Sequence, residues 1–154
     1  MSNDSPLLEG AFSVIQNAIE NYNGELRLVL TSSQVNRLQE FAYETQRDAV
    51  ATGRPTNDKQ LMNQLCIFVA RQAVSQRYVK AGQKMVEELL KLDSLDKAVD
   101  FLKYVSWLYD IVTEFMRILD QQGKRQFLES IRTTNLEGFL RQLTTLKISE
   151  NRFR

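Results

Sequence analysis

The sequence contains no histidine, so its charged side chains are the main candidates for catalysis or ligand binding. Histidine is the side chain best suited to proton transfer near neutral pH, so its absence excludes serine–histidine and cysteine–histidine mechanisms and the common zinc sites. Asp93, Asp96 and Asp100 recur at helical spacing and could hold a divalent metal for hydrolysis. Acids in the first turn of a helix are also favoured by the helix dipole, and this second interpretation is the better one.

Other catalytic arrangements find little support in the sequence. The glycines occur singly, and none belongs to a phosphate-binding loop that opens a helix with Lys-Ser/Thr. The single cysteine, Cys66, lies in an apolar run that predicts a buried, inert thiol. We therefore expect a protein that is not an enzyme and binds no cofactor, metal or small-molecule substrate.

Basic side chains are the remaining candidates, as contacts for the phosphates of a polyanion. Arg77, Lys80 and Lys84 would share one side of a single continuous helix, with Arg71 on the other flank of its apolar stripe. Ordinary solubilising charge is the alternative explanation. The predicted contacts, including two arginines of the preceding helix, are Arg37, Arg47, Arg71, Arg77, Lys80 and Lys84.

The net charge of +1 is unevenly distributed along the chain. Residues 121–154 hold seven lysines and arginines against three acids, whereas residues 1–120 hold 13 basic and 16 acidic side chains. A basic C-terminal part on a slightly acidic body indicates either a polyanionic or an acidic protein partner, or simply a solvated surface.

Apolar periodicity predicts an all-α fold, a compact helical bundle of five to seven helices. Residues 5–6 should begin the first helix, and Asn23-Gly24 should end it. Residues 25–30 are expected to form a short extended link that is too isolated to form a sheet. Thr31 and Gln34 have the spacing of a capping box for the second helix.

Capping residues and glycines are expected to set the boundaries of the later helices as well. Helix three should begin at a cap at residues 57–58 and continue to Gly82. A long central helix should begin at residues 93–95 and end at Gly123, and a last helix should be capped at Thr134 with Glu137 as its partner.

The expected organisation is a helical core over residues 1–122, followed by a basic helical extension over residues 123–154 that packs on or docks beside it. The first six residues lack the basic and apolar regions of a signal peptide, and no apolar run approaches the roughly 18 residues of a membrane span. We therefore expect a cytoplasmic protein without membrane contact.

Three segments, in order, resemble the small subunit of type III-A (Csm) CRISPR effector complexes. They are a helix, link and helix start over residues 12–38, ending in LTSSQVNRL, then LMNQLCIFVARQAVSQR at residues 61–77, and a long helix over residues 95–116 that contains FLKYV at 101–105. Order and spacing agree over residues 10–122. Two features depart from the family. Residues 69–71 read Val-Ala-Arg where the family has Ala-Gly-Arg, so either Arg71 or Arg77 matches the family's arginine. Residues 123–154 extend beyond the typical end of a family member.

The resemblance implies a non-catalytic subunit of an antiviral ribonucleoprotein. Such subunits stack in two or more copies along a crRNA-bound filament of backbone subunits and bridge toward the large signalling subunit. They contact crRNA and target RNA through basic side chains, here the six predicted cations. Three alternatives remain: a helical protein–protein adaptor without nucleic-acid binding, a metal-dependent enzyme that uses the three aspartates, and the small subunit of a sister type III complex.

Overall fold

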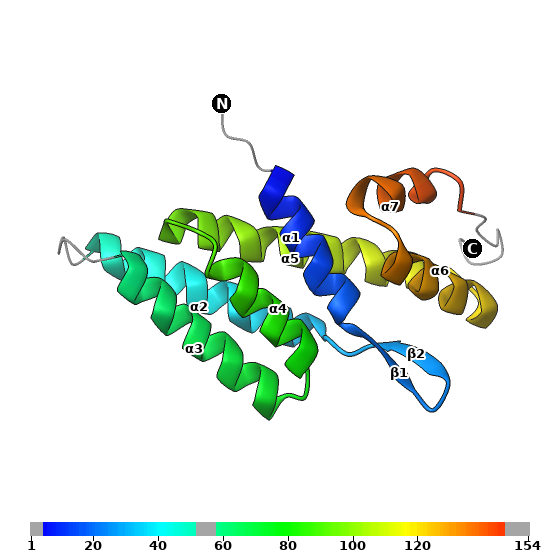
Figure 1. The fold of residues 1–154 in the computed structure, drawn as a ribbon, viewed down its shortest axis with the longest axis horizontal. Coiled ribbons are helices and arrows are strands. Elements are labelled where there is room, and N and C mark those ends of the chain that lie inside the picture. The colour runs from blue at the N-terminus through cyan, green and yellow to red at the C-terminus, as the bar shows by residue number, and fades with distance from the viewer. Residues whose placement is uncertain (1–4, 52–57, 147–154) are drawn as a thin grey trace.

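The computed structural model describes residues 5–51 and 58–146, and the structural statements below concern those residues. They form seven helices and one two-stranded sheet, which confirms the predicted all-α class (Figure 1). The elements are α1 (Ser5–Asn17), β1 (Ile19–Tyr22), β2 (Glu25–Leu28), α2 (Ser32–Ala51), α3 (Asp58–Ser75), α4 (Val79–Leu89), α5 (Leu95–Arg117), α6 (Gln121–Thr133) and α7 (Leu136–Leu143).

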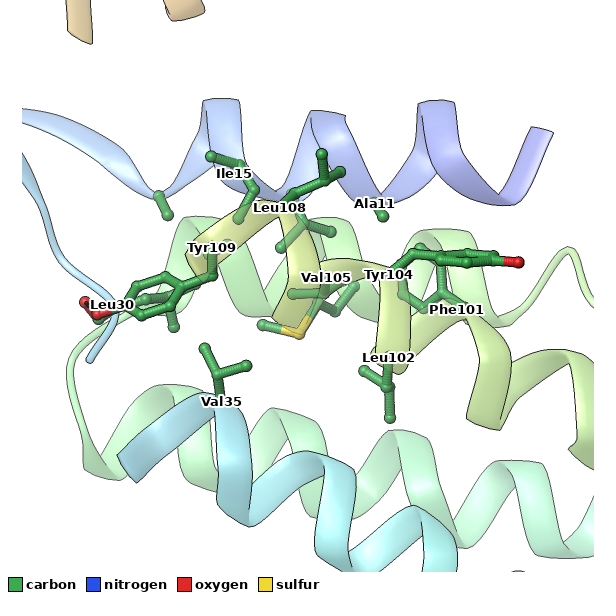
Figure 2. Close-up of a cluster of buried hydrophobic side chains, with 14 of the residues drawn as sticks. Ala11, Ile15, Leu30, Val35, Phe101, Leu102, Tyr104, Val105, Leu108 and Tyr109 are labelled. Atoms are coloured by element: carbon green, nitrogen blue, oxygen red, sulfur yellow. Dashed lines mark hydrogen bonds between the residues drawn. The ribbon is translucent and has the colours of Figure 1, made fainter. Parts of the chain in front are cut away.

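The long apolar helix α5 is the centre of the core, as its pattern predicted. It packs against both α1 and α2, and Figure 2 shows Leu108 close to α1 and Leu102 on the side of α2. Both side chains are buried, as is Phe101. Each large apolar side chain removed from water contributes roughly 1.5–3 kcal/mol, so the stripe on α5 holds the flanking helices together.

Two predicted helix caps are present. The Thr31 backbone N–H donates to Gln34 Oε1 at 3.0 Å, and the Gln34 N–H donates to Thr31 Oγ1 at 3.3 Å, which is the reciprocal pattern of a capping box. At the start of α5, Ser94 Oγ accepts the Lys97 N–H at 3.2 Å. Both caps satisfy backbone amides that have no partner inside the helix, and they fix where α2 and α5 begin.

The segment after α1 differs from the prediction. α1 ends at Asn17, and β1 pairs with β2 in an antiparallel hairpin, so the expected longer helix and the expected unpaired link are both wrong. Asn23 and Gly24 have φ angles of 53° and 85°, which a two-residue type I′ turn requires. Asn-Gly tolerates these angles better than most pairs do, so the residues expected to end a helix instead turn a hairpin.

The prediction of one helix from residue 58 to Gly82 is also wrong. α3 ends at Ser75, Arg77 adopts a left-handed φ of 65°, and the Tyr78 N–H donates to Ala73 O at 2.9 Å. This hydrogen bond, from the sixth residue back to the first around a left-handed fifth residue, is the Schellman motif, a common way to end a helix. The chain therefore reverses, and α4 packs beside α3 with Gly82 in its interior.

The end of α5 and the cap of α7 lie close to the predicted positions but not at them. Asp120 Oδ1 accepts the Gly123 N–H at 2.6 Å, so Gly123 belongs to the first turn of α6 and does not end α5. Asn135, not Thr134, caps α7, and Thr134 is the residue that ends α6. The predicted cap at residue 58 is instead the first residue of α3, while the alternative cap at residue 57 lies outside the described residues.

α6 and α7 pack on the N-terminal helix. The Phe139 ring of α7 lies 5.2 Å from that of Phe12 and 6.1 Å from that of Phe127. The side-chain amide of Gln16 donates to two backbone carbonyls at the end of α6, at 2.9 and 2.6 Å. These contacts join the first described helix to the last two. The boundary at residues 122–123 stays a prediction.

Tyr78 and Tyr109 are both buried but differ in how their hydroxyls are satisfied. The Tyr109 hydroxyl donates to Leu30 O at 3.1 Å, whereas the Tyr78 hydroxyl has no partner among the described residues. Tyr78→Phe should therefore raise the free energy of unfolding by about 1–2 kcal/mol, because it removes an unsatisfied buried group. Tyr109→Phe should lower it by about 1 kcal/mol, because it removes a hydrogen bond.

Urea denaturation of the two variants tests this difference in sign, and a loss of stability in both would contradict the assignment of Tyr78. The alkaline pH dependence gives a second readout. Burial raises the pKa of Tyr78 to about 12, so the unfolded chain, with a pKa near 10, loses its proton first. Stability should consequently fall as the pH rises above 10, and this contribution to the fall should be absent in Tyr78→Phe.

Candidate nucleic-acid interface

The two arginines predicted on α2 do not form one contact site. The guanidinium carbon of Arg37 lies 5.8 Å from the centre of the Phe68 ring, at the contact between α2 and α3. Phe68 in turn stacks on Phe41, with ring centroids 3.9 Å apart. Arg47 follows ten residues later, which on an α-helix rotates it by about 80° and moves it about 15 Å along the axis.

The four cations predicted on one helix are divided among three segments. Arg71 is exposed on α3, Arg77 lies in the turn, and Lys80 and Lys84 share one side of α4. Lys84 Nζ lies 3.4 Å from Glu87 Oε1, so part of its charge is already offset. The prediction of one continuous basic helix face is therefore wrong, because the chain reverses at Arg77. That these six residues contact RNA stays a prediction.

An open groove of about 900 Å³ brings other cations together, at the end of the molecule where the hairpin and α6 lie (Figure 1). It runs between β2, the C-terminal half of α5 and the first half of α6. Its aliphatic side chains are buried or half-buried and form the floor, while most of its cations are exposed at the rim. The floor contains Leu26, Leu28, Leu30, Met116 and Leu128; the rim contains Arg27, Arg117, Lys124 and Arg125.

The cations of this groove differ in how far nearby acids offset them. Arg27 lies 3.5 Å from the Glu25 carboxylate and opposite Glu20 in the hairpin register, and Arg117 pairs with Glu114 one turn earlier on α5. Such exposed ion pairs contribute only about 0–1 kcal/mol to stability, so another anion can replace the acid beside the arginine. Lys124 and Arg125 have no acidic partner within 4 Å in the described part of the chain, so they carry most of the uncompensated charge.

Local structure sets the shape of the groove. The Asn23–Gly24 turn fixes the register of β2, and the Asn21 side chain reinforces it by accepting the Gly24 N–H at 2.8 Å. The Tyr109 hydroxyl holds Leu30 against α5, as Figure 2 shows. The cap at Asp120 begins α6 on the other wall. These three contacts place basic residues from distant parts of the chain around one concave surface.

None of the groove cations belongs to the predicted set, although one signal in the sequence pointed toward them. Lys124 and Arg125 open the basic stretch over residues 121–154, whose charge excess indicated a polyanionic or acidic partner. Arg27 and Arg117 carry no comparable local signal, because each has an acid nearby in sequence. Only the fold shows that these residues meet.

The acids considered as metal ligands have partners on or beside α5. Asp93 lies 3.0 Å from Lys97 Nζ, and hydrogen bonding to that lysine lowers the pKa of Asp93. Asp96 accepts a hydrogen bond from Gln46 at 2.7 Å, and Asp100 lies 3.5 Å from Lys103. Over the described residues no group of three metal-ligating side chains comes together.

Two further expectations concern Cys66 and the membrane. Cys66 is buried, as its apolar surroundings predicted, and burial raises the pKa of its thiol. A thiol with a raised pKa is less often the reactive thiolate at neutral pH. Across residues 5–51 and 58–146, no helix is both long enough and apolar enough to cross a membrane.

No protein-family model, curated protein or solved structure matches the chain. The resemblance to Csm small subunits therefore rests on the three segments quoted above.

Proposed function

We propose that this chain is a non-catalytic helical subunit that contacts RNA within a ribonucleoprotein. In line with the resemblance, the proposed assembly is a type III CRISPR effector complex, with crRNA and target RNA as the nucleic acids. Backbone subunits, the large signalling subunit and further copies of the chain are its protein partners. The proposal includes a cytoplasmic location.

The observation that carries the RNA contact is the basic groove. Four cations from three elements surround it, and one acid, Glu25, lines it among the described residues. Phosphate binding needs converging positive charge and no base-specific geometry, and it releases counterions from the nucleic acid. The one aromatic residue that lines the groove in the described part of the chain, Tyr109, is buried and offers no open ring for bases, so we expect backbone contact with little sequence preference.

The test is RNA binding by the full chain over a range of salt concentrations, with single-stranded and duplex RNA as probes. If the four cations each neutralise one phosphate of a single strand, the logarithm of the binding constant should fall against the logarithm of salt with a slope near −2 to −3. Lys124→Ala/Arg125→Ala should reduce the magnitude of that slope by about 1.4, because it removes two phosphate contacts.

A matched double substitution provides the control. Arg77→Ala/Lys80→Ala removes the same number of charges from the α3–α4 turn and should leave the slope nearly unchanged. If this variant loses binding while the groove variant keeps it, the RNA lies on the originally predicted residues instead of in the groove. If the unmodified chain binds neither RNA at low salt, the proposal of an RNA-contacting subunit fails.

The second candidate is a helical protein–protein adaptor that binds no nucleic acid. It is favoured by exposed aliphatic side chains on the α3–α4 hairpin, which would not contribute to binding the phosphates of RNA. The salt titration separates the two functions, because an adaptor of this kind would show no salt-dependent RNA binding in either variant.

A further inference from the structure

The α3–α4 hairpin exposes an aliphatic stripe. Its solvent-accessible members are Ile67 at 61%, Val74 at 69%, Val79 at 42% and Leu90 at 65%. Scattered apolar residues are normal on a protein surface, but contiguous apolar patches with polar rims mark interaction sites. Whether these four residues are contiguous depends on which sides of the two helices they occupy.

Helical spacing places the four on two neighbouring faces. Ile67 and Val74 are seven residues apart and therefore lie on one side of α3. Val79 begins α4, and Leu90 follows its last residue in a helical conformation, so their eleven-residue spacing also places them on one side of that helix. The opposite sides of the two helices are buried in the core. Because the chain reverses between them and Ala73 touches α4 at Gly82, the two exposed faces lie side by side on the solvent side of the hairpin.

Three cations surround the end of the stripe at the turn. Arg71 lies between the two α3 members in sequence, Arg77 is in the turn, and Lys80 follows Val79 directly. None of the three has an ion-pair partner in the part of the chain that the structure describes. The nearby acid Glu87 is paired with Lys84. The stripe is thus apolar along its length and positively charged at one end.

From this combination we propose that the hairpin stripe docks an amphipathic helix of a protein partner, with aliphatic side chains toward the stripe and acidic residues at its flank. Aliphatic side chains in a shallow groove between helices are a recurring site for such helices. The distance from Val79 to Leu90 corresponds to about three helical turns of a partner. RNA does not fit this surface as well, because exposed aliphatic side chains offer the phosphate backbone neither positive charge nor hydrogen bonds.

The inference does not depend on the RNA proposal, because it concerns a different surface and a different class of partner. It gives another role to Arg71, Arg77 and Lys80, three of the six cations expected to contact RNA. On this stripe they would attract acidic side chains and orient the incoming helix, which is how charges around an apolar patch commonly act.

The experiment measures binding of the full chain to a labelled synthetic helix of about four turns by fluorescence anisotropy. The probe carries leucine along one side and glutamate beside it. A second peptide has lysine in place of every glutamate, and a third has serine in place of every leucine. We expect the first probe to bind with a Kd on the order of 10 µM, and the other two at least about tenfold more weakly.

Neutral substitutions on the chain locate the site. Ile67→Ser/Val74→Ser should weaken binding of the leucine–glutamate probe at least about tenfold, while serine and the two replaced residues differ little in helix propensity. Arg71→Ala/Arg77→Ala should weaken it by a smaller factor. Leu140→Ser, at an exposed apolar residue of α7, and Lys124→Ala/Arg125→Ala, in the groove, are the controls and should leave binding unchanged.

Each contrary result overturns the docking inference. It fails if the leucine–glutamate probe shows no binding up to about 100 µM, a concentration well above the expected Kd. It also fails if the stripe variant binds as tightly as the unmodified chain, if the lysine peptide binds equally well, or if the groove variant is the one that loses binding. Circular dichroism of every variant checks that the helices remain intact.

Discussion

Phe139→Ala is expected to lower the free energy of unfolding by about 3–5 kcal/mol, the usual cost of removing a buried aromatic side chain. Phe139 is fully buried and contacts the rings of Phe12 and Phe127. α7 has eight residues, too few to be stable as an isolated helix, so it depends on this contact. Urea denaturation gives the free energy, and the thermal midpoint should fall by about 10 °C.

The adjacent residue provides the control for this prediction. Leu140 is 46% exposed, so Leu140→Ala should change the free energy of unfolding by less than about 1 kcal/mol. If Phe139→Ala costs no more than Leu140→Ala, α7 does not contribute to the core, and the packing of the C-terminal helices on α1 is contradicted.

Features determined by neighbouring residues could be predicted from the sequence. Thr31 and Gln34 satisfy each other's backbone amides over three residues, and Ser94 caps α5 through an amide in its own first turn. The apolar stripe of α5 repeats over many turns, so its periodicity identified the central helix despite uncertainty at its end. Such signals need no knowledge of distant parts of the chain.

Other features depend on choices between competing local structures. Asn23-Gly24 can end a helix or turn a hairpin, and pairing of β1 with β2 decides between the two. Arg77 adopts a left-handed conformation that is uncommon for a residue other than glycine, so nothing in its type indicated that the chain reverses there. That single reversal separated the cations expected to share one helix face.

The groove could not be predicted because its parts are far apart in the sequence. Arg27 comes from the hairpin, and Lys124 from a helix almost a hundred residues later. The charge excess of residues 121–154 indicated the kind of partner, but not the surface. Bringing these residues together requires the hairpin register, the docking of Leu30 on α5 and the direction of α6, all of which are tertiary features.

Gly82→Leu is expected to lower the free energy of unfolding by about 3 kcal/mol, at the upper end of the usual cost of overpacking. Even a Cβ atom at this position would clash with the Cβ of Ala73, which belongs to the packed side of α3. A leucine would therefore push α4 away from α3 and disturb the buried residues near the turn, including Tyr78. Urea denaturation followed by circular dichroism measures the loss.

Exchanging the two small residues separates the clash from helix propensity. Gly82→Ala alone should cost about 1–2 kcal/mol, although alanine is the better helix former. Adding Ala73→Gly restores one glycine and one alanine to the contact, so the double variant should return close to the stability of the unmodified chain. If it stays as unstable as Gly82→Ala, the two helices do not meet at these residues, and the side-by-side faces that form the stripe of the hairpin lose their support.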